Sequence, residues 1–193
     1  ELKSYAEAMG RELFTPSVLT TLHQFEEADN FGSLIRPAEA DVAPLLHSLQ
    51  GKGAPRDIQL HITHEKVLCA LQQAAYLSQR YHVVIANPPY MGGKGMNGRL
   101  GAWAKDNYPD SKSDLFAMFM ERNLELALEH GAVAMITMQS WMFLSSFESL
   151  RSLILGKHTI LFMAHLGARA FDSIGGEVVS TTTFVLENAH KPN

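Results

Sequence analysis

The sequence VVIANPPYMGG, residues 83–93, joins a run of aliphatic residues to an amide, two prolines, an aromatic ring and two glycines. The aliphatic run predicts a short buried strand over residues 81–87, because β-branched side chains favour extended backbone. Proline has no backbone N–H and fixes its own φ, so the two prolines end the strand and form a stiff corner. The carbonyl of Pro88 is then left without a strand partner, beside the amide of Asn87 and the ring of Tyr90.

Beyond this corner the sequence alternates between strand and helix patterns. Helices of this length between strands imply parallel βαβ units in an α/β fold. The last two strands have a connection too short for a crossover helix, so we expect them to be antiparallel. The predicted strands cover residues 81–87, 131–138, 159–167 and 178–187, and the predicted helices cover residues 114–130 and 145–156.

Residues 1–80 have a helical pattern, and residues 81–193 form the strand-rich remainder of the chain in our division. Thr15 followed by Pro16 predicts a helix start, with a capping hydroxyl before a proline in the first turn. A long amphipathic helix is predicted to lead up to Tyr81. The stretch from Met91 to about Ser113 lacks a clear period, which is typical of a functional lid or a disordered loop.

Composition limits the functions that the chain can have. The chain has 193 residues, 46% of them hydrophobic, and a formal net charge of -4, so any contact with nucleic acid must be local. The single Cys69 excludes an internal disulfide and is compatible with a reducing cytoplasm. No apolar run is long enough to span a membrane, and the first residues do not resemble a signal peptide. We therefore expect a cytoplasmic protein with no membrane partner.

The corner after residue 86 has the chemistry of a binding site. In open α/β sheets, ligands bind beyond the carboxyl ends of the parallel strands. Asn87 and the Pro88 carbonyl offer two hydrogen-bond acceptors beside the flat ring of Tyr90, which suits a planar heterocycle that carries an NH2 group. The alternative is a plain turn, because Asn-Pro and Pro-Pro commonly end strands and a following Tyr often covers a sheet edge.

With its preceding strand, this tetrad resembles that of the amino-methyltransferases, which use S-adenosylmethionine and carry an Asp/Asn-Pro-Pro-Tyr/Phe motif. The similarity continues through most of residues 81–186. Four stretches in order narrow it to the PglX family, the adenine-specific DNA methyltransferases of BREX phage-defence systems: FGSLIRP (31–37), NPPYMGGKGMN (87–97), YPDSKSDLFAMFMER (108–122) and GARAFDSIGGEVVSTTTFVL (167–186). The implied fold is the second half of a Rossmann-like class I methyltransferase, preceded by a helical segment.

The resemblance implies a role for each residue of the motif. Asn87 and the carbonyl of Pro88 would accept hydrogen bonds from the target amine, with Pro89 holding the corner. We expect the Tyr90 ring to be exposed at the strand end, where it would stack on an adenine flipped out of double-stranded DNA. Phe171 would close on the other face of the base, although one extra residue separates Phe171 from Gly167 relative to the family pattern. The implied reaction needs no metal, covalent intermediate or strong general base.

Other parts of the cofactor site are missing from the sequence. The family binds S-adenosylmethionine mainly through a glycine-rich loop after an earlier strand, and no such strand and turn precede Asn87. The GGKG stretch at residues 92–95 has no Ser or Thr after its Lys and is not a phosphate loop. We therefore expect an internal fragment that is inactive alone and binds cofactor and DNA weakly. Its candidate partners are the rest of the methyltransferase and other defence-system proteins.

Further residues have two interpretations each. Asp114 caps a helix, and the resemblance also implies a supporting place near the cofactor. Lys94, Arg99 and Lys105 either contact DNA phosphates or are ordinary solvated charges. The sequence HITHEK, residues 61–66, lacks the spacing of a zinc motif, so no metal site is predicted there. Ser140 and Ser173 lack the Gly-x-Ser-x-Gly context of a hydrolase.

Three functions remain open at this point. The first is a DNA adenine methyltransferase in a phage-defence or restriction-modification system. The second keeps the chemistry but methylates RNA adenine or glutamine side chains of proteins. The third is a DNA-sensing or assembly module in which catalysis is dispensable.

Overall fold

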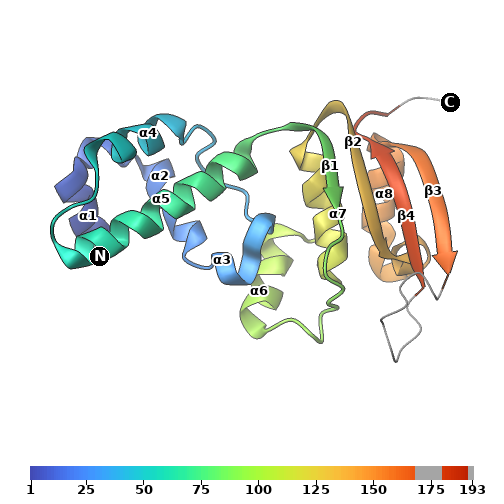
Figure 1. The fold of residues 1–193 in the computed structure, drawn as a ribbon. Coiled ribbons are helices and arrows are strands. Elements are labelled where there is room, and N and C mark those ends of the chain that lie inside the picture. The colour runs from blue at the N-terminus through green and yellow to red at the C-terminus, as the bar shows by residue number, and fades with distance from the viewer. Residues whose placement is uncertain (168–179, 191–193) are drawn as a thin grey trace. The chain divides into compact units, whose positions relative to one another are not determined.

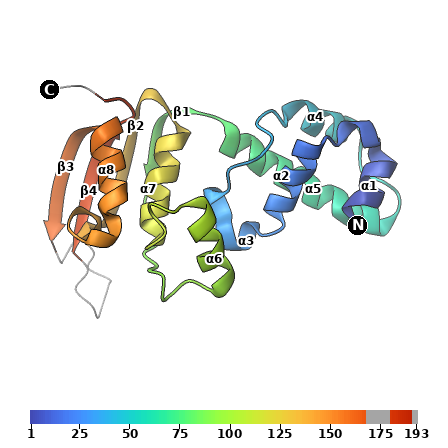
Figure 2. The same cartoon turned by 180° about the vertical axis from the view of Figure 1, so that it is seen from behind.

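The computed structural model describes residues 1–167 and 180–190, and the chain divides into two compact units, residues 1–79 and 80–193. The first unit is helical, and its longest helix, α5, packs against α1, α2 and α4 (Figures 1 and 2). Its elements are α1 (Leu2–Met9), a 3-10 turn (Arg11–Leu13), α2 (Pro16–Phe25), α3 (Ala28–Phe31), a 3-10 turn (Gly32–Leu34), α4 (Ala43–Lys52) and α5 (Ile58–Ser78). Among the residues described, no helix has both the length and the apolar character needed to cross a bilayer.

Local sequence signals explain two of these helices. The Thr15 hydroxyl accepts a hydrogen bond from the Val18 N–H at 3.3 Å, and Pro16 is the first helical residue, so the predicted start of α2 is confirmed. The Asp57 carboxylate caps α5 in the same way and accepts from two backbone N–H groups, each at 3.0 Å. The predicted long helix before Tyr81 is α5 itself.

The described part of the second unit contains a four-stranded sheet and three α-helices. Its elements are β1 (Tyr81–Ala86), α6 (Gly98–Asn107), α7 (Leu115–Leu126), β2 (Ala127–Met138), two 3-10 turns (Gln139–Met142 and Ser145–Phe147), α8 (Glu148–Lys157), β3 (Thr159–Gly167) and β4 (Thr181–Glu187). The strand order is β1-β2-β4-β3. Strands β1 and β2 are parallel, and β4 is antiparallel to both β2 and β3. The predicted α/β class, with a parallel βαβ unit and an antiparallel final pair, is confirmed.

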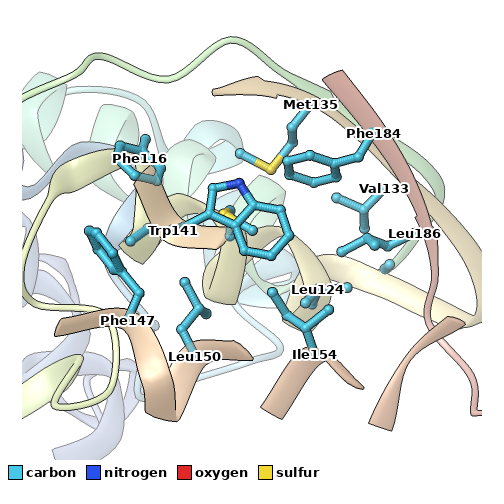
Figure 3. Close-up of a cluster of buried hydrophobic side chains, with 13 residues drawn as sticks. Phe116, Leu124, Val133, Met135, Trp141, Phe147, Leu150, Ile154, Phe184 and Leu186 are labelled. Atoms are coloured by element: carbon cyan, nitrogen blue, oxygen red, sulfur yellow. The ribbon is translucent and has the colours of Figure 1, made fainter. Parts of the chain in front are cut away.

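Helices α7 and α8 cover the same face of the sheet, as the two opposite views show. The buried side chains between them and the sheet form a core that is centred on Trp141, whose ring meets that of Phe184 edge-on at 5.4 Å (Figure 3). Because Val133 lies opposite Leu186 and Met135 opposite Phe184, the register of β2 against β4 places these four side chains on the covered face. The core therefore fixes the position of both helices on the sheet.

Strand β1 is only half buried, whereas the sequence predicts a buried strand. Val84 and Ala86 pack against the core, but the alternate residues Val83 and Ile85 are 56% and 78% exposed. Phe162 of β3 is also 54% exposed. Side chains alternate between the two faces of a strand, and α7 and α8 cover only one of them. A continuous aliphatic run therefore does not guarantee burial on both faces within the described part of the second unit.

A bulge at the start of β2 explains why α7 ends earlier than predicted. Tyr81 pairs with Ala127 and Val83 pairs with Ala132, so residues 128–131 bulge out of the ladder, with His130 at a φ of 61°. A side chain at Gly131 would place its Cβ 2.8 Å from the Leu128 carbonyl oxygen, which explains the glycine. The predicted helix over residues 114–130 is thus wrong at its end, because the chain is already extended at residue 127.

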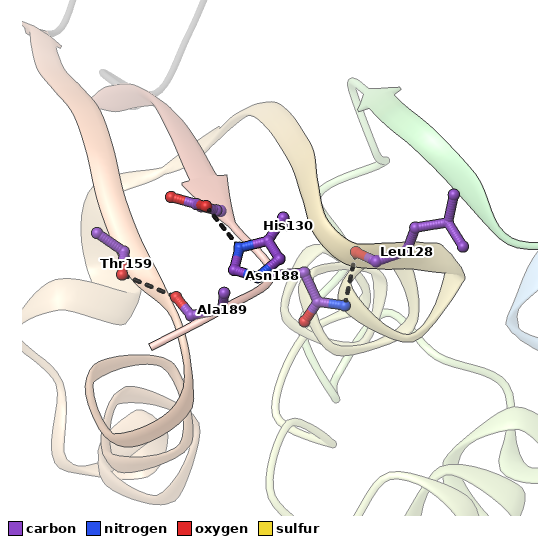
Figure 4. A network of polar contacts seen from close by, with 6 residues as sticks. Leu128, His130, Thr159, Asn188 and Ala189 are labelled. Atoms are coloured by element: carbon purple, nitrogen blue, oxygen red, sulfur yellow. Dashed lines mark hydrogen bonds and ion pairs between the residues drawn. The ribbon is translucent and has the colours of Figure 1, made fainter. Parts of the chain in front are cut away.

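The residues after β4 close this end of the sheet (Figure 4). The Asn188 side chain donates to the carbonyls of Ala127 and Leu128 at 3.0 and 3.2 Å, which satisfies carbonyl groups of the bulge. His130 contacts Glu187 at 3.1 Å, and the Thr159 hydroxyl donates to the Ala189 carbonyl at 2.7 Å. The start of β2, the end of β4 and the start of β3 are therefore joined by side-chain hydrogen bonds.

The stretch from Met91 to Ser113 contains a helix, which corrects the prediction of a structureless loop. The Asn97 side chain caps α6 by accepting from the Leu100 N–H at 2.8 Å. Leu100 and Ala104, four residues apart, are the only buried residues of this helix. This short pattern is why the periodicity of the sequence fails to predict α6.

Candidate active site

The tetrad lies directly beyond the carboxyl end of β1. Its four residues have no regular secondary structure. In the parallel partner strand β2, Met135 lies opposite Ala86, and β2 then continues to Met138. Asn87 and Pro89 are exposed, Pro88 is buried and Tyr90 is half buried. The chain therefore leaves the sheet at a position where, in open α/β sheets, ligands are bound.

The two acceptors of the tetrad are unclaimed within residues 1–167 and 180–190. No described group donates a hydrogen bond to the Asn87 side chain or to the carbonyl of Pro88. The prolines explain the second observation, because they end the ladder between β1 and β2. The Asn87 amide oxygen and the Pro88 carbonyl are thus both without a donor among the described residues.

Tyr90 packs on the core instead of projecting freely from the strand end. Its ring meets that of Phe116, on α7, edge-on at 6.1 Å. Its hydroxyl is buried and has no hydrogen-bond partner among the described residues, and this burial raises the pKa of the Tyr90 hydroxyl. The expectation of an exposed ring needs correction: Tyr90 is half buried, with its polar end turned into the protein.

Asp114 lies beside the tetrad and is 9% exposed. Its Oδ1 accepts a hydrogen bond from the Met91 N–H at 2.9 Å and another from the Phe116 N–H at 3.4 Å. Burial raises the pKa of Asp114, and the backbone hydrogen bonds that its carboxylate accepts oppose this rise. Asp114 therefore caps α7 and also holds the residue that follows Tyr90. Its place near a cofactor stays a prediction.

The link between Asp114 and Met91 was missed by sequence reasoning. The two residues are separated by a glycine-rich turn, α6 and a further turn, and no periodicity connects them. A signal was present in the capping pattern, because Asp114 precedes a helix, but a cap predicts only the contact within that helix.

The other predicted site residues are less closely placed. Phe171 and Ser173 lie outside the described residues. Lys94, Arg99 and Lys105 are exposed and follow the tetrad, the last two on α6. At the same sheet edge, the His165 ring of β3 hydrogen-bonds the side chain of Gln139, which follows β2. The carboxyl ends of β2 and β3 are thereby tied to each other.

The histidines of HITHEK have structural partners. The Nδ1 of His64 is 2.7 Å from the Tyr5 hydroxyl, and His61 contacts Glu65 at 3.6 Å. The described part of the chain holds no group of three His, Cys, Asp or Glu side chains arranged for a metal ion. A hollow of about 790 Å³ beside α1 and α2 contains none of the predicted site residues.

Taken together, these contacts describe a corner that combines two hydrogen-bond acceptors with an aromatic ring. The Asn87 amide oxygen and the Pro88 carbonyl have no described donor, and the half-buried Tyr90 ring follows them in the chain. The buried Asp114 carboxylate accepts a hydrogen bond from the next backbone N–H, that of Met91. Such a corner can orient a planar group by its N–H bonds and its face. It contains no nucleophile poised by a neighbouring base.

Comparison with known proteins shows which family the chain resembles. The model of the family described as Eco57I restriction-modification methylase matches residues 20–171. The adenine-specific methyltransferase BrxX of Escherichia coli O9:H4 (strain HS) is 51% identical over 176 residues. The adenine-specific methyltransferase PglX of Lacticaseibacillus casei (strain Zhang) is 53% identical over 111 residues. The resemblance inferred from the sequence is confirmed.

These relatives are much longer than the present chain. The matched region makes up 90% of the chain but 15% of BrxX, and 58% of the chain but 9% of PglX. A solved structure of a class I S-adenosylmethionine-dependent methyltransferase from Listeria monocytogenes aligns with a TM-score of 0.47 at 17% identity. That alignment covers 93% of this chain and 62% of the other.

Proposed function

The chain belongs to the Eco57I restriction-modification methylase family, and from this premise we propose that it carries the amine-binding end of a DNA adenine methyltransferase that acts in phage defence. The observation that carries the proposal is the tetrad at the carboxyl end of β1, with two acceptors that no described group uses. The names of both relatives as adenine-specific methyltransferases support adenine as the acceptor.

Capture of the base falls to Tyr90. The exocyclic amine of adenine is out of reach inside a duplex, so the base must be flipped out at a cost of a few kcal/mol. Stacking on an aromatic ring contributes roughly 1–3 kcal/mol per base, which is enough to offset much of that cost. In this proposal, Phe171 closes on the second face of the base, and Lys94, Arg99 and Lys105 contact DNA phosphates.

Asn87 and Pro88 prepare the amine for attack. Its lone pair is delocalised into the adenine ring, so the free amine is a poor nucleophile. Hydrogen bonds from its two N–H groups to the Asn87 oxygen and the Pro88 carbonyl favour a pyramidal nitrogen and direct the lone pair outward. The same acceptors stabilise the positive charge that develops as the new N–C bond forms. A proton then leaves the methylated nitrogen for solvent.

S-adenosylmethionine, when bound, supplies the methyl group from its sulfonium. The described residues fit the acceptor side of this reaction, because they provide the tetrad and its aromatic wall. They do not fit the main cofactor site: before Asn87 they contain no strand followed by a glycine-rich turn. We therefore assign only the binding and alignment of the amine to this chain.

The proposal is tested by the substitution Asn87→Ala in the intact protein. Removal of one acceptor of this kind costs about 10²–10³ in rate, so adenine methylation should fall at least about a hundredfold. Asn87→Asp keeps an oxygen acceptor and should retain measurable activity. The matched control is Asn107→Ala, which removes an exposed amide of α6 that donates to the Trp103 carbonyl. Methylated positions are counted by sequencing host DNA.

The outcome also separates the alternatives. Labelled methyl groups that appear in RNA or protein, and not in DNA, would replace DNA adenine by another acceptor. Full adenine methylation by the Asn87→Ala protein would remove Asn87 from the site. An intact protein that methylates nothing would support a sensing or assembly role.

A further inference from the structure

The segment that follows the tetrad is fastened to the start of α7 by backbone contacts. Gly92 and Asp114 form an isolated antiparallel bridge. In this bridge the Leu115 N–H donates to the Met91 carbonyl at 3.1 Å, and the Gly93 N–H donates to the Ser113 carbonyl at 3.2 Å. The tetrad is therefore anchored on one side by β1 and on the other by residues 113–115.

The Asp114 side chain completes this attachment. One carboxylate oxygen accepts from the Met91 N–H at 2.9 Å, and the same oxygen caps α7 through the Phe116 N–H at 3.4 Å. The shorter of the two bonds is the one to Met91. Phe116, two residues later, carries the ring against which Tyr90 packs. One helix start thus holds both the backbone after Tyr90 and the Tyr90 ring.

We propose that Asp114 is a positioning residue for the tetrad, which fixes Met91 and through it the place of the Tyr90 ring and the Pro88 carbonyl. This inference rests on the proposed function for its catalytic consequence. The contact itself is independent of that function. Asp114 acts through hydrogen-bond acceptance, so its shape matters more than its charge.

The alternative is a plain helix cap. Ser, Asn and Asp all cap helices well, because each places an oxygen within reach of the first-turn N–H groups. A cap alone is satisfied by the shorter Ser side chain. The bond to Met91 requires the longer reach of Asp or Asn, since it crosses from α7 to another segment.

A series at this position separates the two roles in the intact protein. Asp114→Asn keeps the acceptor and the reach, Asp114→Ser keeps the cap but not the reach, and Asp114→Ala removes both. The matched control is Asp57→Ala, which removes the carboxylate cap of α5 in the helical unit and touches no part of the tetrad.

Two measurements are made on each protein. The first is hydrogen exchange of the Met91 amide. Loss of a bond to a carboxylate should speed exchange about ten- to hundredfold in Asp114→Ala and Asp114→Ser, while Asp114→Asn and Asp57→Ala remain near the wild type. The second is the single-turnover rate of adenine methylation at saturating cofactor and DNA, which should fall about tenfold or more in the same two variants and recover in Asp114→Asn.

Several results would overturn the proposal. Asp114→Ser with wild-type exchange and rate would make Asp114 a cap only. Asp114→Ala with weaker cofactor binding but an unchanged rate at saturation would place its role at the cofactor. Unchanged Met91 exchange in Asp114→Ala would remove the contact altogether. If the wild-type protein methylates no DNA, the proposed function fails, and the exchange measurement still decides whether Asp114 holds the tetrad.

Discussion

Tyr90 combines two environments that are usually separate. Part of the ring is available at the strand end, and the rest packs on Phe116 with the hydroxyl buried and unpartnered among the described residues. A buried hydroxyl without a partner costs free energy relative to its hydrated state. The hydroxyl is therefore expected to contribute nothing favourable to stability, and in the proposed function only the ring contacts the base.

This view predicts different outcomes for three substitutions at Tyr90. Tyr90→Phe removes only the unpartnered hydroxyl, so stability should stay equal or rise by up to about 1 kcal/mol and methylation should persist. Tyr90→Leu keeps apolar packing on Phe116 but loses the stacking face, and Tyr90→Ala loses both. Stacking of roughly 1–3 kcal/mol corresponds to an about five- to 160-fold loss of methylation in both. Thermal unfolding and single-turnover rates of the intact protein measure the two effects.

Comparison of Tyr90→Leu with Tyr90→Ala separates the loss of stacking from the loss of packing, because only Tyr90→Ala should also lower the melting temperature. A Tyr90→Leu protein that methylates DNA at the wild-type rate would show that Tyr90 merely covers the edge of the core.

At the scale of elements, the alternation of patterns after residue 81 is enough to predict the parallel pair of β1 and β2 and the antiparallel β3 and β4. It does not predict that β4 inserts between β2 and β3, because a short connection specifies direction and not the neighbour on the far side. The sequence also predicts the wrong end for α7, because Ala127, Leu128 and Glu129 have good helix propensity. In the structure, Ala127 pairs with Tyr81 at the start of β2, and the next residues form the bulge.

The candidate site, too, is only partly predictable from the sequence. The tetrad is local in sequence, so its acceptors and its corner are predictable from Asn87 to Tyr90. The support of the site is not local: it depends on Asp114 and Phe116, which reach the tetrad only after α6 and the turns around it are folded. A sequence pattern predicts the structure and the chemical groups of one segment, whereas the contact between two segments depends on the fold.

The joint between α1 and α5 gives a prediction of pH dependence. The Nδ1 of His64 forms a hydrogen bond with the buried Tyr5 hydroxyl at 2.7 Å. Burial lowers the pKa of His64, and the charge of His61 acts in the same direction. The unfolded chain therefore binds this proton more readily than the folded chain. Stability should fall as the pH drops below about 6.5, with a slope of at most about 1.4 kcal/mol per pH unit from this group.

Denaturant unfolding of the wild type and of His64→Gln between pH 8 and pH 5.5 measures this term. Gln retains a polar side chain that does not titrate, so the free energy of unfolding of the variant should depend less on pH over this range. Equal slopes for the two proteins would contradict the assignment to His64.

At the scale of the molecule, the two faces of the sheet in the second unit differ in how far helices cover them. Helices α7 and α8 cover one side of the sheet, while Val83, Ile85 and Phe162 are exposed on the described sheet. The chain spans about 15% of the length of BrxX and 9% of that of PglX. In the proposed function, the described residues therefore supply one end of a site, which consists of the tetrad with its Tyr90 ring and of Asp114, whose carboxylate accepts a hydrogen bond from the Met91 N–H.

This division predicts that the 193-residue chain binds S-adenosylmethionine and target DNA weakly. In the proposed function the described acceptors bind only the target amine, and among these residues no strand before Asn87 ends in a glycine-rich turn that would receive the cofactor. Neither the sulfonium nor the nucleoside then has a dedicated set of contacts. Titration calorimetry should show no saturation below about 1 mM, which corresponds to about 4 kcal/mol of binding free energy, whereas the intact protein should bind far more tightly. Micromolar affinity of the 193-residue chain would show instead that residues around the tetrad form a cofactor site by themselves.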